Sequence, residues 1–160
     1  MASDYLLEIE GIKGESKDKK HPGTIEIHSF SWGVSNAGSM ASGSGGGAGK
    51  ASFSDLSFMS TTASQSPLLM LACATGQHIK SAKLFVRKQG SEQHDYYVIT
   101  LSDILVSSFQ HSGSDGSGGP PSESFSLNFT KIEYSYSPQK PDGSLDTAIK
   151  GSWNLKENVK

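Results

Sequence analysis

Apolar and polar side chains alternate along residues 123–139, which read Glu-Ser-Phe-Ser-Leu-Asn-Phe-Thr-Lys-Ile-Glu-Tyr-Ser-Tyr-Ser-Pro-Gln. A period of two is typical of a β-strand with one apolar and one polar face. The apolar set is Phe125, Leu127 and Phe129 before Lys131, and Ile132, Tyr134 and Tyr136 after it. Because a β-bulge produces such a slip of phase within a strand, we expect a long, curved, bulged strand that passes from one sheet face to the other.

Similar patterns predict strands over residues 5–10, 24–32, 53–59, 82–88, 96–109 and 149–159. The second of these also changes phase, because its apolar positions are Ile25 and Ile27 and then Phe30 and Trp32. Residues 11–22 form a charged loop, and the Pro-Asp-Gly-Ser sequence at 141–144 is typical of a turn. The chain is therefore predicted to be mainly β.

One short α-helix is expected at about residues 66–75. Ser66 is suited to cap it, Pro67 to occupy its first turn, and Gly76 to end it in a left-handed conformation. Its side chains, Leu69 and Met70 among them, are apolar nearly all round. A helix of this kind has to be covered on more than one side, so it either plugs one end of a barrel or is held between the barrel and another subunit.

A flexible Gly-rich loop is expected at about residues 36–50, with Gly43, Gly45, Gly46 and Gly47 at its centre. It does not match a phosphate-binding loop, because a strand pattern rather than a helix follows it. Ordering such a segment costs about 1–2 kcal/mol per residue, so we expect it to lie on a neighbouring subunit in an assembly. The length of the whole chain, residues 1–160, fits a single domain.

Composition narrows the function further. The charged fraction is 19% and the net charge is −2, and no long basic run is present, so a nucleic-acid partner is not expected. A single cysteine, Cys73, allows no disulfide framework and is expected to be a buried thiol. The N-terminal segment lacks the features of a signal peptide, and no apolar run is long enough to span a membrane. We expect synthesis in the cytoplasm and no membrane insertion.

No catalytic, cofactor-binding or metal-binding constellation can be assembled from the sequence. There is no G-x-S-x-G elbow and no H-E-x-x-H pair. His28, His94 and His111 have unrelated spacing and are expected to be surface imidazoles, because zinc sites usually pair ligands locally. We therefore predict that the protein is not an enzyme and has no cofactor.

Several motifs, in order, carry a resemblance to one family. They are the Leu-Ser-Asp-Ile-Leu-Val-Ser-Ser run from Leu101, the 123–139 segment, Phe30-Ser-Trp32-Gly33, the Ser66-Pro67 helix with Thr75-Gly76, and Leu84-Phe-Val-Arg-Lys88. Together these motifs resemble the hemolysin-coregulated proteins (Hcp), the inner-tube subunits of bacterial type VI secretion systems. The resemblance covers nearly the whole chain. Ser60 and Ala63 depart from it, because the family often has Lys and Asp there, and ring stability is then expected to rest on other contacts.

This resemblance implies a two-sheet antiparallel β-barrel with one helix, homo-hexameric rings, and rings stacked into a tube inside a sheath. It also implies effector proteins carried in the lumen, contacts with spike and sheath components, and secretion through the type VI system without a cleaved signal peptide. The candidate inter-subunit residues are Phe30, Trp32, Gly43, Gly45, Gly46, Gly47, Leu69 and Met70. The candidate lumen-facing residues, which lie on polar strand faces, are Glu26, His28, Ser124, Ser126 and Asn128.

Two other functions remain open on the sequence alone. The first is a monomeric barrel that binds a small ligand inside it, although Phe125, Phe129 and Trp153 are expected to fill so small an interior. The second is an enzyme with an unrecognised hydrolase site. The mass of the particle in solution separates both from a tube subunit, because only the tube subunit requires a closed ring much larger than one chain.

Overall fold

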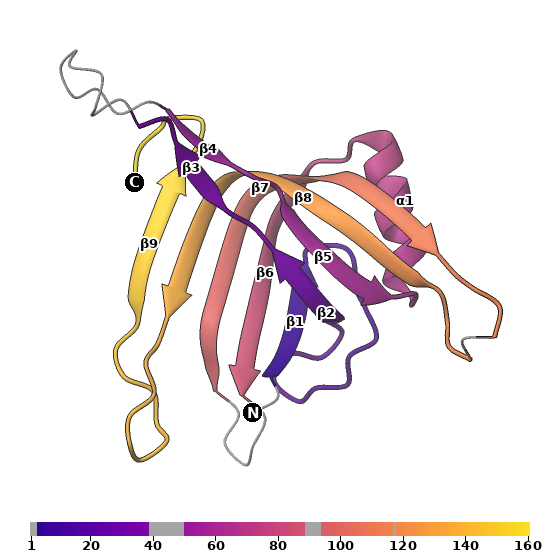
Figure 1. Cartoon of the computed structure of the whole chain (residues 1–160), viewed down its shortest axis with the longest axis horizontal. Helices are drawn as coiled ribbons and strands as arrows, with labels where there is room; N and C mark the ends of the chain where they lie inside the picture. Colours follow the sequence, from indigo (N-terminus) through magenta and orange to yellow (C-terminus); the bar gives the residue numbers. More distant parts are fainter. Residues whose placement is uncertain (1–2, 39–49, 89–93, 117) are drawn as a thin grey trace.

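The computed structural model describes residues 3–38, 50–88, 94–116 and 118–160 (Figure 1). Its elements are β1 (Ser3–Ile9), β2 (Ile25–Ser31), β3 (Val34–Asn36), β4 (Ala51–Phe53), β5 (Leu56–Thr61), α1 (Gln65–Thr75), β6 (Ile79–Lys88), β7 (Asp95–Ser112), β8 (Ser122–Tyr136) and β9 (Ile149–Asn154). All the strand pairings between these elements are antiparallel. The mainly β prediction with one short helix is confirmed for the described part of the chain.

The barrel is a curved sheet that closes on itself. Its strand order is β5-β2-β1-β6-β7-β8-β9, and β5 also pairs with β8, which joins the two ends of a six-strand circuit. The long strand β8 serves two partners, because its residues 122–127 pair with β5 and its residues 131–136 pair with β9. Strand β9 therefore extends the sheet beside the closed part of the barrel, as Figure 1 shows at the left.

The barrel interior is filled by side chains from every strand of the circuit. Phe58 and Phe125 stack at its centre with ring centroids 5.2 Å apart, and each is about 1% exposed. The most deeply buried aliphatic residues around them are Leu7, Ile25, Leu56, Leu84, Ile99, Leu101, Ile104 and Leu127. This packing leaves a hydrophobic core where a ligand-binding barrel would have a cavity.

The slip of phase in β8 is present, but its geometry differs from the predicted bulge. The inward residues change from Phe129 to Ile132 in β8, and from Ile104 to Leu101 in the facing strand β7. Since Ile104 pairs with Phe129 and Leu101 pairs with Ile132, both strands change phase together and the ladder keeps its register. Between these pairs, Asp103 of β7 adopts a positive φ of 50°.

A register shift does occur between these strands, at a different point. It lies between Val106 and Ser108 of β7, so the extra residue belongs to β7 rather than to β8. The phase change predicted for residues 24–32 also corresponds to an irregularity, because the β2–β5 register shifts between Ile27 and Ser29. Sequence alternation thus detects where a strand changes face, but it does not identify which strand of a pair carries the extra residue.

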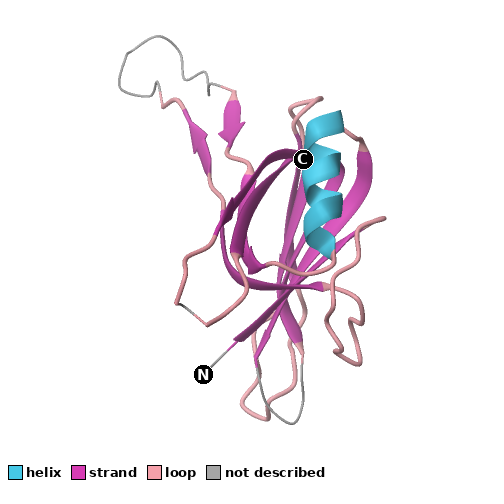
Figure 2. Cartoon of the chain, turned by 90° about the vertical axis from the view of Figure 1, so that its right-hand side faces the viewer, coloured by secondary structure: helices cyan, strands magenta, loops and turns pink. Residues whose placement is uncertain are grey.

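Helix α1 begins one residue earlier than predicted and ends where predicted. The N-cap residue is Ser64, whose side chain makes no capping hydrogen bond, and the hydroxyl of Ser66 is turned to other partners. Gly76 ends the helix with φ 65°, and its backbone N–H donates to the carbonyls of Ala72 and Cys73 in the last turn. Leu69 and Ala72 face the core, and Figure 2 shows the helix lying along one side of the barrel.

The predicted strand over residues 53–59 is divided into β4 and β5 at Ser54 and Asp55. Strand β4 pairs with β3 in a short ribbon that projects from the barrel (Figure 1). Ser54 fixes the base of this ribbon, since its N–H donates to the Gly33 carbonyl at 2.9 Å and its Oγ accepts from the Gly33 N–H at 2.8 Å. Most of the predicted Gly-rich loop, residues 39–49, lies outside the described residues.

The charged loop before β2 packs on the outside of the sheet. Arg87 of β6 is 3% exposed, and its guanidinium pairs with Asp18 of the loop and with Asp4 of β1. The positive charge and hydrogen bond of Arg87 lower the pKa of the Asp18 carboxyl below its usual range. His21 stacks on Phe85 at a centroid distance of 3.9 Å. These contacts attach the loop to a fixed place on the barrel wall.

Candidate assembly surfaces

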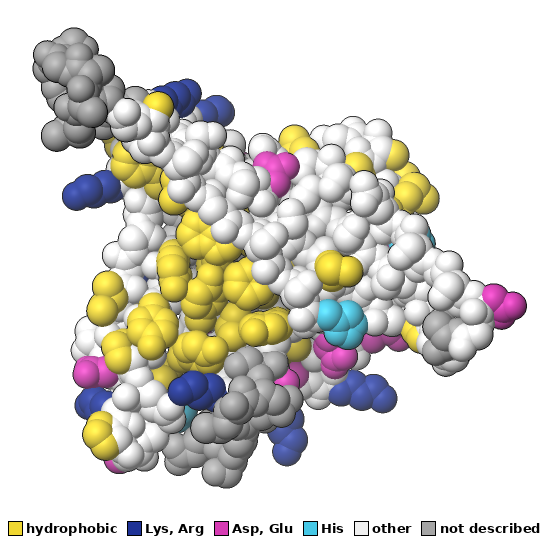
Figure 3. All heavy atoms as spheres, in the orientation of Figure 1, with side chains coloured by type: hydrophobic (Ala, Val, Ile, Leu, Met, Phe, Trp, Pro, Cys, Tyr) yellow, Lys and Arg dark blue, Asp and Glu magenta, His cyan; other side chains and the backbone are white. Residues whose placement is uncertain are grey.

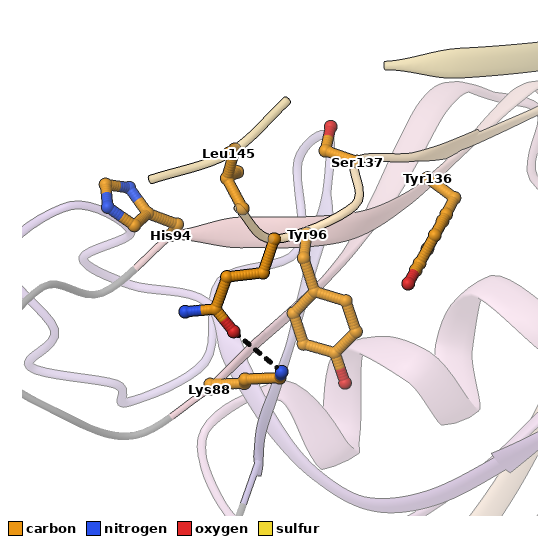
Figure 4. Close-up of a pocket in the computed structure, with 7 residues that line it drawn as sticks. Lys88, His94, Tyr96, Tyr136, Ser137 and Leu145 are labelled. Carbon is orange, nitrogen blue, oxygen red and sulfur yellow. Dashed lines mark hydrogen bonds between the residues drawn. The ribbon is translucent and has the colours of Figure 1, made fainter. Parts of the chain in front are cut away.

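A small pocket lies where β6 ends and β7 begins, lined by Lys88, His94, Tyr96, Tyr136, Ser137, Gln139 and Leu145 (Figure 4). Its volume is about 60 Å³. Lys88 Nζ donates to Gln139 Oε1 at 2.9 Å and lies 5.6 Å from the centre of the Tyr96 ring. The lysine is thus already engaged by other groups of the pocket.

Within the described residues, no three His, Cys, Asp or Glu side chains come together as a metal site. None of the helices seen in that part of the chain is both long and apolar enough to cross a membrane. The predicted surface positions of His28 and His111 are confirmed, His94 is partly buried, and the predicted buried thiol, Cys73, is only half-buried.

An aromatic cluster, made of Tyr5, Phe30, Trp32, Tyr97 and Tyr134, packs on the core where β9 splays from the closed barrel. Its rings are in contact along a chain, with centroids 5.6 Å apart for Tyr5 and Phe30 and 4.7 Å apart for Tyr97 and Tyr134. Each member remains half-buried. Figure 3 shows a broad hydrophobic area in the hollow between β9 and the β2–β3 segment.

Two polar groups of the aromatic cluster are paired with each other. Trp32 Nε1 donates to the hydroxyl of Tyr97 at 3.1 Å. Burial raises the pKa of the Tyr97 hydroxyl above its ordinary value, while the hydrogen bond from Trp32 opposes that shift. The cluster is therefore a pre-formed, mainly aromatic surface whose tryptophan N–H is already paired, which suits contact with another apolar surface.

The outer helix face, made of Leu68, Met70 and Leu71, is a second apolar surface on another side of the barrel. These side chains are 44%, 50% and 54% exposed, respectively. By contrast, Leu69 has no exposed surface and belongs to the core. The sequence hypothesis that Leu69 contacts a neighbouring subunit is therefore corrected, because a residue buried within its own chain has no surface to offer a partner.

The other candidate contact residues lie as follows. Phe30 and Trp32 belong to the aromatic cluster, and Met70 belongs to the outer helix face. Gly43, Gly45, Gly46 and Gly47 fall outside the described residues. Sequence reasoning did not select Leu68 and Leu71, because nearly every helix position is apolar. The spacing of Leu69 and Ala72 is a weak signal, because it marks the buried side of the helix and leaves the other apolar positions as the exposed ones.

The serine face is a neutral polar surface over β2, β5, β7 and β8. It is formed by Ser29, Ser31, Ser57, Met59, Ser108, Gln110, Ser124 and Ser126 and contains a shallow depression of about 340 Å³, which Phe30, Phe58 and Phe125 also line. Ser124 is partly exposed, but Ser126 is only 9% exposed and lies 2.7 Å and 2.5 Å from the hydroxyls of Ser107 and Ser108. Ser126 therefore supports this surface more than it offers a contact.

The remaining candidate lumen residues lie beside or beyond the serine face. Glu26 and His28 are exposed and border a depression of about 250 Å³ near Thr61. His28 Nε2 lies 2.6 Å from the Thr61 hydroxyl. Asn128 is exposed, and its amide donates to Asp55 at 2.9 Å. Of the five candidates, Ser124 and Ser126 thus lie on the serine face, and Glu26 and His28 border a second depression. The side chain of Asn128 is held by Asp55.

A filled barrel with an apolar helix face, an aromatic cluster and a neutral serine face defines a structural subunit that presents surfaces to other chains. Comparison with known proteins gives its family. Residues 6–136 match the family described as type VI secretion system effector, Hcp. The curated protein hcp1 of Pseudomonas aeruginosa is 45% identical over 161 residues, which cover 99% of each chain. The chain therefore belongs to the Hcp family and is a secreted subunit of the type VI secretion tube.

Solved structures agree with this assignment. A structure of a type six secretion system protein superposes with a TM-score of 0.93 at 30% identity, covering 98% of each chain. The crystal structure of Hcp1 from Salmonella typhimurium gives a TM-score of 0.81 at 33% identity, covering 99% of each chain. The predicted barrel of this family is thereby confirmed.

Proposed function

We propose that this chain closes into homo-hexameric rings by seating the outer helix face of one subunit on the aromatic cluster of the next. The exposure of Leu68, Met70 and Leu71 on a helix whose other side is buried carries this proposal. Contiguous exposed apolar residues mark interaction sites in soluble proteins. The partner surface has matching chemistry, because the aromatic cluster is half-buried and its tryptophan N–H is already paired.

The two surfaces differ and lie on different sides of the barrel, so their contact is heterologous. A heterologous contact repeats from subunit to subunit and gives a ring when its rotation closes. The number six and the stacking of rings into a tube are taken from the family. In such a tube we expect the β3–β4 ribbon to contact a neighbouring subunit, because it projects from the barrel.

The serine face is proposed to line the lumen and to contact effector proteins. Neutral hydroxyls form weak hydrogen bonds and carry no strong field, which suits cargo that has to be released. Six copies acting on one effector strengthen a weak contact through effective concentration. Spike and sheath components are the further proposed partners. The subunit is proposed to be made in the cytoplasm, to leave through the type VI system without a cleaved signal peptide, and to have no enzymatic activity.

The test is the mass of the purified protein in solution. Light scattering coupled to gel filtration, at micromolar concentration, is expected to give six times the mass of one chain. Negative-stain images of the same fraction are expected to show hollow rings. A strictly monomeric particle would contradict the proposal and favour an isolated barrel. The filled interior around Phe58 and Phe125 already argues against a ligand-binding role for such a monomer.

A further inference from the structure

Glu123 is a buried carboxylate that the proposed function does not use. It lies near the start of β8, and its side chain is fully enclosed. Acidic side chains are rarely buried to this extent unless several donors meet them. The contacts of Glu123 therefore indicate which elements of the fold it connects.

Three donors from two other elements converge on one oxygen of Glu123. Gln65 Nε2 donates to Glu123 Oε1 at 2.6 Å, and the hydroxyls of Ser60 and Ser66 donate at 2.9 and 3.0 Å. Ser60 belongs to β5, whereas Gln65 and Ser66 form the first turn of α1. A single carboxylate thus joins β5, β8 and the beginning of the helix. Hydrogen bonds to an ionised acceptor are roughly twice as strong as neutral ones.

The helix lacks the local features that usually fix its N-terminus. Its first turn contains no acidic residue, and the N-cap Ser64 makes no side-chain capping bond. The first N–H groups of a helix and its positive dipole end favour a nearby anion. Two carboxylates from distant segments meet this end: Glu15 accepts from the backbone N–H of the N-cap Ser64 at 3.0 Å, and Glu123 accepts from two side chains of the first turn. The helix is therefore anchored by tertiary contacts.

The second oxygen of Glu123 faces a different environment. Oε2 is buried without a hydrogen-bond partner, and the nearest basic group is His111 Nε2 of β7, at 3.9 Å. Thr62, after β5, lies 3.4 Å from the same imidazole nitrogen. The hydrogen bonds that described side chains make to this carboxylate thus run through Oε1, toward β5 and α1. Its bonding geometry is directed at the helix and not at the solvent.

We infer that Glu123 is a positioning residue: it holds α1 in the orientation that presents Leu68, Met70 and Leu71 to a neighbouring subunit. This inference rests on the proposed ring contact. Leu69 and Ala72 press the helix onto the core, but apolar contacts are not directional. Two directional hydrogen bonds, from Gln65 and Ser66, tie the first turn to one oxygen, and Ser60 of β5 donates to the same oxygen.

Variants of Glu123 distinguish the effect of side-chain length from the effect of side-chain charge. Glu123→Ala removes the anchor, Glu123→Gln keeps an acceptor oxygen at the same reach, and Glu123→Asp keeps the charge but is one carbon shorter. Ile132→Ala is the control, because Ile132 is equally buried on the same strand, in the half that pairs with β9. Ring mass is measured for each variant over a dilution series. Thermal unfolding shows whether each barrel remains folded.

Hydrogen exchange then reports on the helix itself. Exchange of residues 65–76 is measured by mass spectrometry in chains that also carry Leu71→Asp, so that all variants are compared as monomers. Glu123→Ala is expected to speed exchange in this segment at least 10-fold relative to β6 and β7, and to raise the concentration at which rings dissociate at least 10-fold. Glu123→Gln is expected to restore most of both properties, and Glu123→Asp little of either. Ile132→Ala is expected to show no selective effect on the helix.

The outcomes decide between this inference and simpler ones. Equal effects of Glu123→Ala and Ile132→Ala on exchange and on rings would overturn it, because Glu123 would then only stabilise the fold. Selective release of the helix with unchanged rings would overturn it as well. If the wild-type chain itself formed no rings, the proposed function would fail, and the exchange data would still show whether Glu123 anchors α1. If Glu123→Ala did not fold, the comparison of Glu123→Gln with Glu123→Asp would decide.

Discussion

Replacing Leu71 by Asp is the most direct test of the outer helix face. The Leu71 side chain is 54% exposed in the single chain, so about half of its burial is still to be gained. Complete burial of a leucine contributes about 1.5–3 kcal/mol, so the contact gains roughly 0.8–1.6 kcal/mol from this residue. A carboxylate placed there loses that gain and in addition has to be desolvated without a partner.

The expected result is a loss of rings with little loss of fold. Removing roughly 0.8–1.6 kcal/mol weakens each contact about 4- to 15-fold, and a ring of six repeats the loss at every contact. Leu71→Ala, which removes only the apolar contact, is expected to weaken the rings by about this amount. Leu71→Asp is expected to abolish nearly all rings. The thermal midpoint of the monomer should change little, since surface substitutions usually stay within about 0.5 kcal/mol.

Two controls complete the experiment. Gln77→Asp introduces the same charge at an exposed position just beyond the helix and is expected to leave rings intact. Leu69→Ala removes a fully buried side chain from the same helix and is expected to destabilise the barrel by about 2–5 kcal/mol. Light scattering gives the ring mass, and calorimetry gives the stability. Intact rings in Leu71→Asp, at concentrations where the wild type forms rings, would refute the assignment of this face.

Three further predictions concern other parts of the chain. The pKa of Asp18 is lowered in the folded state, so its pair with Arg87 stabilises the fold above about pH 4 and loses this effect as pH falls through the lowered value. The difference in unfolding midpoint between wild type and Asp18→Asn should therefore shrink from pH 6 to pH 2.5. A methyl group at Gly14 would lie 2.6 Å from the Thr24 carbonyl oxygen, so Gly14→Ala should cost about 1–3 kcal/mol in urea unfolding, whereas Gly119→Ala, in open space, should be neutral. Ser124→Arg should leave rings intact but change the amount of effector that co-purifies, and an unchanged amount would exclude this position as a cargo contact.

The strands were predictable because each has to bury one face. Alternation located all the long strands, and the changes of phase at residues 24–32 and after Lys131 were read correctly as changes of face. The bulge expected after Lys131 is not found, because both strands change phase there together and the ladder keeps its register. The bulge lies instead between Val106 and Ser108 of β7, since the alternation of one strand does not record the register of its partner. That same bulge places three serine hydroxyls together, which is why Ser126 is not a free surface residue.

The helix shows where local rules give way to tertiary contacts. Gly76 could be identified as its end, because a left-handed conformation favours glycine regardless of the surroundings. The beginning could not be identified in the same way. Ser66 has the sequence signature of a cap, but its hydroxyl is bound by Glu123, a residue 57 positions further along the chain. Nothing in the local pattern around Ser66 indicates that partner.

The two apolar surfaces are both fixed before any partner arrives. Leu69, Ala72 and the Glu123 hydrogen bonds hold α1, while ring contacts and the bond between Trp32 and Tyr97 hold the aromatic cluster. Immobilising a flexible side chain on association costs about 0.5–1.5 kcal/mol, and surfaces that are already ordered avoid most of that cost. A contact worth only a few kcal/mol can then close a ring, since each subunit is held by two neighbours at once. Weak but pre-ordered contacts of this kind suit a ring that assembles from single chains.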